Sequence, residues 1–140
     1  MENPHASHPH HTIVLFGEAE KGEFSTAYFC ESLSQLVDFL GNPPEESLGL
    51  FFAVQALLFH RHLIFFRVRE EGFSSQDYLQ GLDLLKQQVE VPPISAICIP
   101  GVGDVEIVNA AMPLCVKHHS ILITTESDFY DYLSQRKPKE

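Results

Sequence analysis

The histidines are the side chains in this sequence best suited to binding a metal ion. The chain has 8 histidines in 140 residues. His60 and His62 alternate, whereas His118 and His119 are adjacent at the end of a predicted helix. Neither pair has the i, i+4 spacing of a helical zinc site, and no cysteine or carboxylate partner is close in sequence. We therefore predict no metal site.

An acidic loop is the second candidate for chemistry. Glu18, Glu20 and Glu23 lie close together and could act as paired carboxylates in acid–base catalysis. A solvated acidic loop is the simpler interpretation of the same residues. The sequence has no nucleophile elbow and no cysteine in a polar loop. We therefore predict no catalytic residue and a protein that is not an enzyme.

The glycine loop Pro100–Asp104 is the third candidate. It separates the apolar run Ile94–Ile99 from a helical pattern that begins at Val105. A loop between a strand and a helix can bind phosphate through its backbone amides. A small ligand or nucleotide bound there would use Gly101, Gly103 and Asp104.

The side chains of this loop favour a structural turn. It contains no lysine followed by serine or threonine, and Glu106 stands where a dinucleotide fingerprint would place a third glycine. Asp104 and Glu106 would repel an anion, and Asp104 suits the N-cap of the helix that follows. We therefore predict no cofactor, and a small Rossmann-like ligand-binding domain stays as the alternative function.

The charge of the sequence limits the classes of binding partner, and its cysteine content indicates the cellular compartment. The formal net charge is −10 at pH 7 and there is no basic stripe, which argues against nucleic acid or an anionic membrane as a partner. Residues 1–60 hold eight acids and one lysine, so an acidic face on the first half is expected. Cys30, Cys98 and Cys115 form no CxxC pair and favour core thiols in a reducing, cytoplasmic compartment. The first eleven residues are polar and do not resemble a secretory signal.

Hydrophobic patterning predicts one α/β domain. The predicted strands are Thr12–Phe16, Leu63–Val68, Ile94–Ile99 and Ser120–Thr124. The predicted helices are Leu33–Leu40, Glu46–Phe59, Asp77–Val89 and two that begin near Val105 and Thr125. We expect residues 12–134 to form a mainly parallel sheet of about four strands flanked by helices, with Rossmann-like layering. Residues 1–11 are predicted to be a flexible tail and residues 135–140 a frayed terminus.

Several local features follow from spacing. Ser32 and Gln35 form a predicted capping box, and Gly41 ends that helix. Two apolar helix faces are predicted, one from Leu33, Leu36, Val37 and Leu40 and one from Val105, Val108 and Met112, with Ala111 and Cys115 beside them. Arg67 and Arg69 alternate on a strand end, so both side chains point the same way, toward a salt bridge or a partner.

The apolar stretch Leu48–Phe66 is the one segment that resembles a membrane span. It contains Arg61, and an arginine near the centre of a membrane helix costs roughly 2.5–3.5 kcal/mol. A buried helix followed by a buried strand explains the stretch better. The helix is apolar on nearly every side, so we expect its own fold or a partner to cover it.

The order of these motifs resembles the contractile tail-sheath family of phages and type VI-like injection systems. The first strand ends in a glycine and an acidic loop bounded by a second glycine, and the next helix has an apolar-Gly ending. An Ala-Val helix, an Arg-Val strand end, a Gly-Leu helix start and an Ile-Pro-Gly strand end follow, as Ala53-Val54, Arg67-Val68, Gly81-Leu82 and Ile99-Pro100-Gly101. The structural motif positions are Gly17, Gly22, Gly41, Arg67, Pro100 and Gly101.

This resemblance spans about residues 12–133 and implies a structural protein. Known members polymerise around an inner tube and shorten on firing, without an active site. The chain is similar to the core of such a subunit without the long terminal arms that add strands to neighbouring subunits. The resemblance implies partners that are copies of this chain or other sheath-type and tube-type proteins. It also implies a place in a virion or injection particle as an alternative to the cytoplasm.

Overall fold

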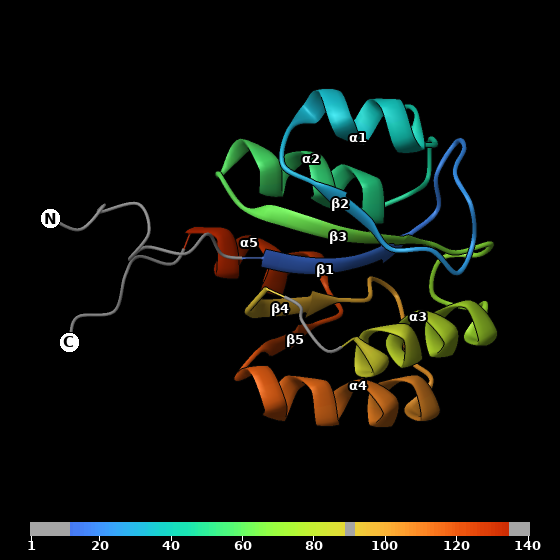
Figure 1. Cartoon of the computed structure of the whole chain (residues 1–140), viewed down its shortest axis with the longest axis vertical. Coiled ribbons are helices and arrows are strands. Elements are labelled where there is room, and N and C mark those ends of the chain that lie inside the picture. Colours follow the sequence, from blue (N-terminus) through green and yellow to red (C-terminus); the bar gives the residue numbers. More distant parts are fainter. Residues whose placement is uncertain (1–11, 89–91, 135–140) are drawn as a thin grey trace, which may run out of the picture.

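The computed structural model describes residues 12–88 and 92–134, which form an α/β domain (Figure 1). The strands are β1 (Thr12–Gly17), β2 (Tyr28–Cys30), β3 (His62–Arg67), β4 (Ile94–Cys98) and β5 (Ile121–Ile123). The helices are α1 (Leu33–Leu40), α2 (Gly49–Leu58), α3 (Ser75–Gln87), α4 (Val105–His118) and α5 (Glu126–Ser134). The predicted tail 1–11 and the predicted frayed terminus 135–140 lie outside the described residues.

The sheet has five strands in the order β2-β3-β1-β4-β5. Strand β1 pairs in parallel with β3 and with β4, and β4 pairs in parallel with β5. The four predicted strands and the mainly parallel sheet are therefore confirmed. The fifth strand, β2, was not predicted and pairs antiparallel with β3 at one edge. Three residues are too few for an alternating pattern to reveal a strand.

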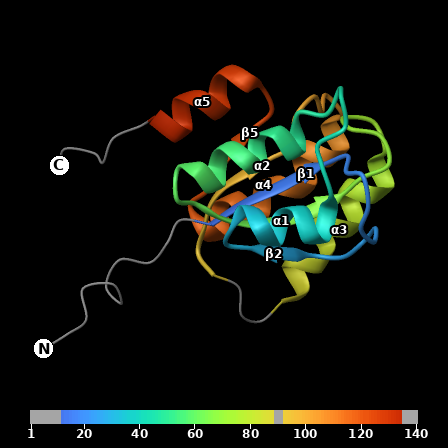
Figure 2. The same cartoon turned by 90° about the horizontal axis from the view of Figure 1, so that it is seen from above.

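Helices cover both faces of the sheet and give three layers, with α1 and α2 above the strands and α3 and α4 below them in Figure 1. Figure 2 shows α5 beside α2, where the rings of Phe52 and Phe129 stack. Side chains of β1 alternate between the two cores. Ile13 and Leu15 pack with residues of α1, α2 and α5, whereas Val14 and Phe16 pack with residues of α3 and α4. All six residues of β1 are buried because the strand has neighbours on both edges and helices on both faces. The Rossmann-like layering is confirmed.

The predicted apolar faces of α1 and α4 are partly wrong. In α1 the buried residues are Leu36 and Leu40, whereas Leu33 and Val37 are exposed. In α4 the buried face contains Ile107, Ala111, Leu114 and Cys115, while Val105 and Met112 are exposed. Each helix has more apolar residues than one stripe can hold, so contact with the sheet decides which face is buried.

Helix ends match the predicted signals more closely. Gln35 N donates to Ser32 Oγ at 3.2 Å, and Gln35 Oε1 accepts from Glu31 N at 2.6 Å. Gly41 ends α1 with a φ of 79°, and its N–H donates to Val37 O at 2.9 Å. The stretch Leu48–Phe66 contains α2 followed by β3, as predicted. Among the described residues, no helix has both the length and the hydropathy needed to cross a membrane.

Candidate functional site

A parallel α/β sheet offers one position for a binding site that topology alone defines. After β1 the chain forms β2 and then β3 on one side of it, whereas the connection that leaves β4 leads to β5 on the other side. Ligands of open α/β sheets bind beyond the carboxyl ends of the two strands where this direction reverses. Here that position lies between the loops that follow β1 and β4.

A groove of about 340 Å³ lies at this position. Its lining residues come from four separate segments and are Glu18, Glu46, Leu48, Glu70, Glu71, Phe73, Pro100 and Gly101. We call it the carboxyl-end groove. Four of the eight are glutamates, and Phe73 is 72% exposed. The groove therefore combines negative charge with accessible apolar surface.

Glu71 occupies the start of helix α2 beside the groove. Its Oε2 accepts from Leu48 N at 2.7 Å and its Oε1 accepts from Ser47 Oγ at 2.9 Å. Both oxygens accept from Gly49 N, at 3.2 and 3.1 Å, and Oε1 also accepts from Glu18 N at 3.1 Å. A carboxylate at a helix N-terminus satisfies amides that have no partner within the helix. An anionic ligand at this helix would have to displace a carboxylate that belongs to the chain.

Backbone contact holds the same helix start against the end of β1. A Cβ atom built on Gly49 would lie 2.6 Å from Gly17 Cα and 2.8 Å from Phe16 O. A Cβ atom on Gly17 would lie 2.7 Å from Gly49 Cα. Only glycine at both positions allows this approach. Gly17, predicted as a motif position, therefore has a direct packing role, and its partner Gly49 was not identified from the sequence.

The loop Pro100–Asp104 borders the other side of the groove and uses its polar groups within the chain. Gly101 N donates to Thr124 O at 3.1 Å, and Val102 N donates to Ile99 O at 3.2 Å. Asp104 accepts from Glu106 N at 2.8 Å, which confirms the predicted N-cap. Nothing lies within 4 Å of a Cβ atom built on Gly103. The loop is thus held by hydrogen bonds from Gly101 and Val102, and Gly103 has open space beside it.

The predicted acidic loop and the two arginines have structural contacts. Glu18 Oε2 accepts from Glu71 N at 2.9 Å, and Glu20 Oε1 accepts from Asn42 N at 2.9 Å. Arg69 forms an ion pair with the buried Asp77 at 2.6 Å, so the predicted salt bridge is confirmed for this residue.

Two other predicted motif positions, Arg67 and Gly22, contact each other beside Arg69. Arg67 Nη1 donates to Gly22 O at 2.6 Å, and the guanidinium groups of Arg67 and Arg69 lie 4.6 and 4.4 Å from the centre of the Phe24 ring. Both arginines therefore point the same way, as their alternation predicts. The backbone of Gly22 has a φ of 112°, which favours glycine at this turn.

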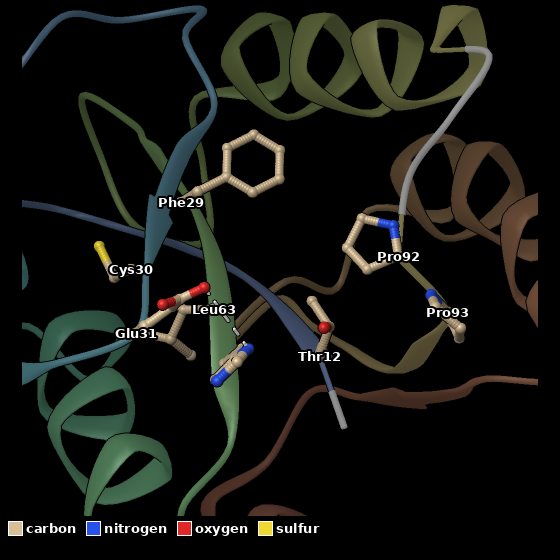
Figure 3. A pocket seen from close by; sticks show the side chains of 8 residues that line it. Thr12, Phe29, Cys30, Glu31, Leu63, Pro92 and Pro93 are labelled. Carbon is tan, nitrogen blue, oxygen red and sulfur yellow. Dashed lines mark ion pairs between the residues drawn. The ribbon is translucent and has the colours of Figure 1, made fainter. Parts of the chain in front are cut away.

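A second hollow, of about 240 Å³, lies at the amino ends of β1 and β3 (Figure 3). Its lining is mainly apolar and includes Phe29, Leu63 and Pro92. Glu31 Oε2 lies 4.0 Å from His62 Nδ1, and the dashed line in Figure 3 marks this pair. This hollow is far from the strand ends at which α/β folds bind ligands.

The titratable groups predicted as metal ligands or core thiols lie apart. All three cysteines are buried and unpaired, and burial raises the pKa of Cys30 to about 11. Burial, and then the charge of Lys117, lowers the pKa of His118, so its position near a helix C-terminus does not dominate. Within residues 12–88 and 92–134, no three His, Cys, Asp or Glu side chains are placed to hold a metal ion.

No family model matches the chain, and neither does any curated protein or solved structure. The interpretation of the groove and of the surface therefore depends on the chain's own residues.

Apolar side chains on the outside of three helices form a further candidate interface. Leu33 and Val37 on α1 are four residues apart, and Phe51 and Leu58 on α2 are seven apart. Helix α4 carries Val105, Met112 and Val116, which are 69%, 43% and 70% exposed. Residues four or seven apart lie on one face of a helix. Helices α1 and α2 cover one face of the sheet and α4 the other, so exposed apolar stripes lie on two opposite sides of the domain.

Glu71 and Gly49 are the site residues that sequence reasoning missed. A glutamate in a polar loop has no local signal, because its partners Ser47 and Gly49 are more than twenty residues away. Ser47-Leu48-Gly49 after two prolines does resemble a helix start. The sequence pattern predicts the start of this helix at Glu46, three residues before the first residue of α2.

Proposed function

We propose that this chain is a non-enzymatic assembly module that acts through protein–protein contacts and resembles the core of a contractile tail-sheath subunit. The observation that carries the proposal is the pair of exposed apolar stripes on opposite sides of the domain. Soluble monomers rarely expose large continuous apolar patches, and apolar side chains that gather on one face of a helix suit an interaction site. Two separate surfaces suit a subunit with more than one neighbour.

The hydrogen bonds within the chain at the carboxyl-end groove also favour this function over nucleotide binding. Glu71 fills the helix start at which a phosphate would bind, and the amides of Gly101 and Val102 donate within the chain. The order of the motifs adds the resemblance to the sheath family. The predicted partners are other copies of this chain or sheath-type and tube-type proteins.

Sedimentation velocity with light scattering, from low micromolar to near-millimolar protein, tests the proposal. We expect a mass that rises with concentration above the 15.8 kDa of one chain. The double variant V105E/V116E removes the α4 stripe and should shift this association to higher concentration. These side chains are exposed, so the fold should be retained, as circular dichroism can check.

The matched control is Q76E/Q80E, which adds the same two charges to exposed positions of α3, the other helix on that face of the sheet. It should associate like the wild type. A wild-type chain that stays strictly monomeric at the highest concentration contradicts assembly through copies of itself. Equal effects of the two double variants would show that net charge, not the apolar stripe, controls association.

A further inference from the structure

We infer that the basic segment of one copy, residues 135–140, binds in the carboxyl-end groove of another copy. This inference rests on the proposed function, because it names the two surfaces of one contact between copies. It depends on three observations: the chemistry of the groove, the distribution of basic residues along the chain, and the distance between the groove and the end of α5.

The groove suits a segment that carries both positive charge and aliphatic carbon. Glu46 and Glu70 are exposed on its rim, and Glu18 is partly exposed. Phe73 is 72% and Leu48 37% exposed beside them. The stems of lysine and arginine side chains cover apolar surface while their charged ends reach carboxylates. A neutral or acidic segment would leave the rim carboxylates without a countercharge.

The same chain contains such a segment. Only nine lysines and arginines occur in the sequence, and Arg136, Lys137 and Lys139 are three of them. Two others, Arg67 and Arg69, lie against Phe24 and already bond to Gly22 O and to Asp77. The densest positive charge of the chain thus lies in the basic segment. Against a total net charge of −10, it is the part of another copy that the groove would attract.

Helix α5, which precedes the basic segment in the sequence, ends at the opposite end of the domain from the groove. The hydroxyl of Tyr132 in α5 contacts Ser95 Oγ near the start of β4, and Arg61, just before β3, lies 5.3 Å from the Tyr132 ring centre. Figure 1 shows α5 on the side from which β1 starts, away from its arrowhead. The groove lies beyond the arrowheads, because Glu70 follows the end of β3.

Chain length favours binding between copies over binding within one. Strand β3 (His62–Arg67) alone spans about 17 Å at a rise of about 3.3 Å per residue, and the groove residues Glu70 and Phe73 lie further along the chain. Lys139 is five residues beyond the end of α5, which allows at most about 18 Å of extended chain. We therefore assign the contact to two copies. Each contact uses one groove and one basic segment, which are different surfaces.

Complementary charge reversals test this pairing in the full chain. E46K/E70K reverses the rim of the groove, and R136E/K137E/K139E reverses the basic segment. Each variant alone should self-associate at least about tenfold more weakly than the wild type in sedimentation velocity. Their equimolar mixture should recover association, because the acidic groove of one variant is intact and so is the basic segment of the other. Rising ionic strength should weaken the wild-type contact.

The control for E46K/E70K is D83K/D131K, which makes the same change in net charge on the exposed faces of α3 and α5, outside the groove. It should associate like the wild type. Wild-type association that neither reversal weakens would overturn this inference and leave the proposed function standing. Weakening by E46K/E70K alone would also overturn it, because the groove would then bind another segment. A wild type that never associates would contradict both proposals.

Discussion

The two loops that border the carboxyl-end groove differ in how they are held. After β1, the backbone of Gly17 touches that of Gly49, and Glu71 fills the adjoining helix start. After β4, the loop Pro100–Asp104 is held by hydrogen bonds to Thr124 O and Ile99 O, and Gly103 has open space beside it. The glycine-rich loop that attracts attention in the sequence is thus the less constrained of the two. Glycine content alone does not show where a backbone must come close.

The largest expected effect tests the contact at β1. Gly49→Val places a branched side chain 2.6 Å from Gly17 Cα and 2.8 Å from Phe16 O, and backbone atoms cannot move aside as a flexible side chain can. We expect a loss of about 3 kcal/mol or more in the free energy of unfolding. Urea unfolding followed by circular dichroism measures it.

The control for this prediction is Gly103→Val in the other loop, where nothing lies within 4 Å of the added Cβ. Its cost should stay within about 0.5 kcal/mol. If both variants lose the same stability, the two loops are equally constrained and the comparison between them fails.

The second largest expected effect is the loss of stability when the Glu71 carboxylate is removed. Glu71→Ala leaves the amides of Leu48 and Gly49 without their acceptor, and the hydroxyl of Ser47 keeps only Glu18 O, at 3.3 Å. Hydrogen bonds to a charged group and a lost helix cap together predict a loss of about 2–3 kcal/mol. Thermal and urea unfolding measure it. The neighbouring Glu70→Ala is the control, because Glu70 is exposed and should change stability by about 0.5 kcal/mol or less.

We expect Glu71→Gln to lose less free energy of unfolding than Glu71→Ala, which would separate the role of the hydrogen bonds from that of the charge. Glutamine keeps one carbonyl oxygen that can accept from Leu48 N, but it has no negative charge for the helix terminus. If Glu71→Ala is as stable as Glu70→Ala, water replaces the carboxylate at no cost and Glu71 does not hold the helix start.

The sequence predicts what depends on local pattern. Runs such as Ile94–Cys98 revealed the four parallel strands, and Ser32, Gly41 and Asp104 act as the helix caps that their types predict. The sequence did not reveal β2, because three residues paired to a strand more than thirty positions away have no local signature. The role of Glu71 was hidden for the same reason. Its partners Glu18 and Ser47 come close only when the sheet has formed.

Exposed apolar residues mark another limit of pattern reasoning. Helical spacing predicted that Val37 and Met112 would be buried, but they are 47% and 43% exposed. Periodicity identifies a stripe that can be buried, and it does not say whether the chain itself or a neighbouring molecule covers it.

The third effect tests how the loop after β4 is held. Asp104 accepts from Glu106 N at 2.8 Å and from Ser75 Oγ at 3.1 Å. Asp104→Ala should therefore cost about 1 kcal/mol, the usual value of an N-cap. Asp104→Asn keeps an acceptor oxygen and should cost clearly less, with both measured by urea unfolding. A cost equal to that of Glu71→Ala would show that the two loops are held with the same strength.

The smallest expected effect is that of a substitution at Gly103, and it tests whether this glycine has a role other than backbone flexibility. Gly103 has no positive φ, and a Cβ atom there meets nothing within 4 Å, so Gly103→Ala should stabilise the fold by a few tenths of a kcal/mol through the unfolded state. A thermal-shift screen with nucleotides gives the second readout, since a bound ligand stabilises the folded state by mass action. If a nucleotide stabilises the wild type and Gly103→Val abolishes the shift, the loop after β4 is a ligand site. In that case the open space at Gly103 is where a ligand backbone or phosphate approaches, and the loop after β1 is the structural one of the pair.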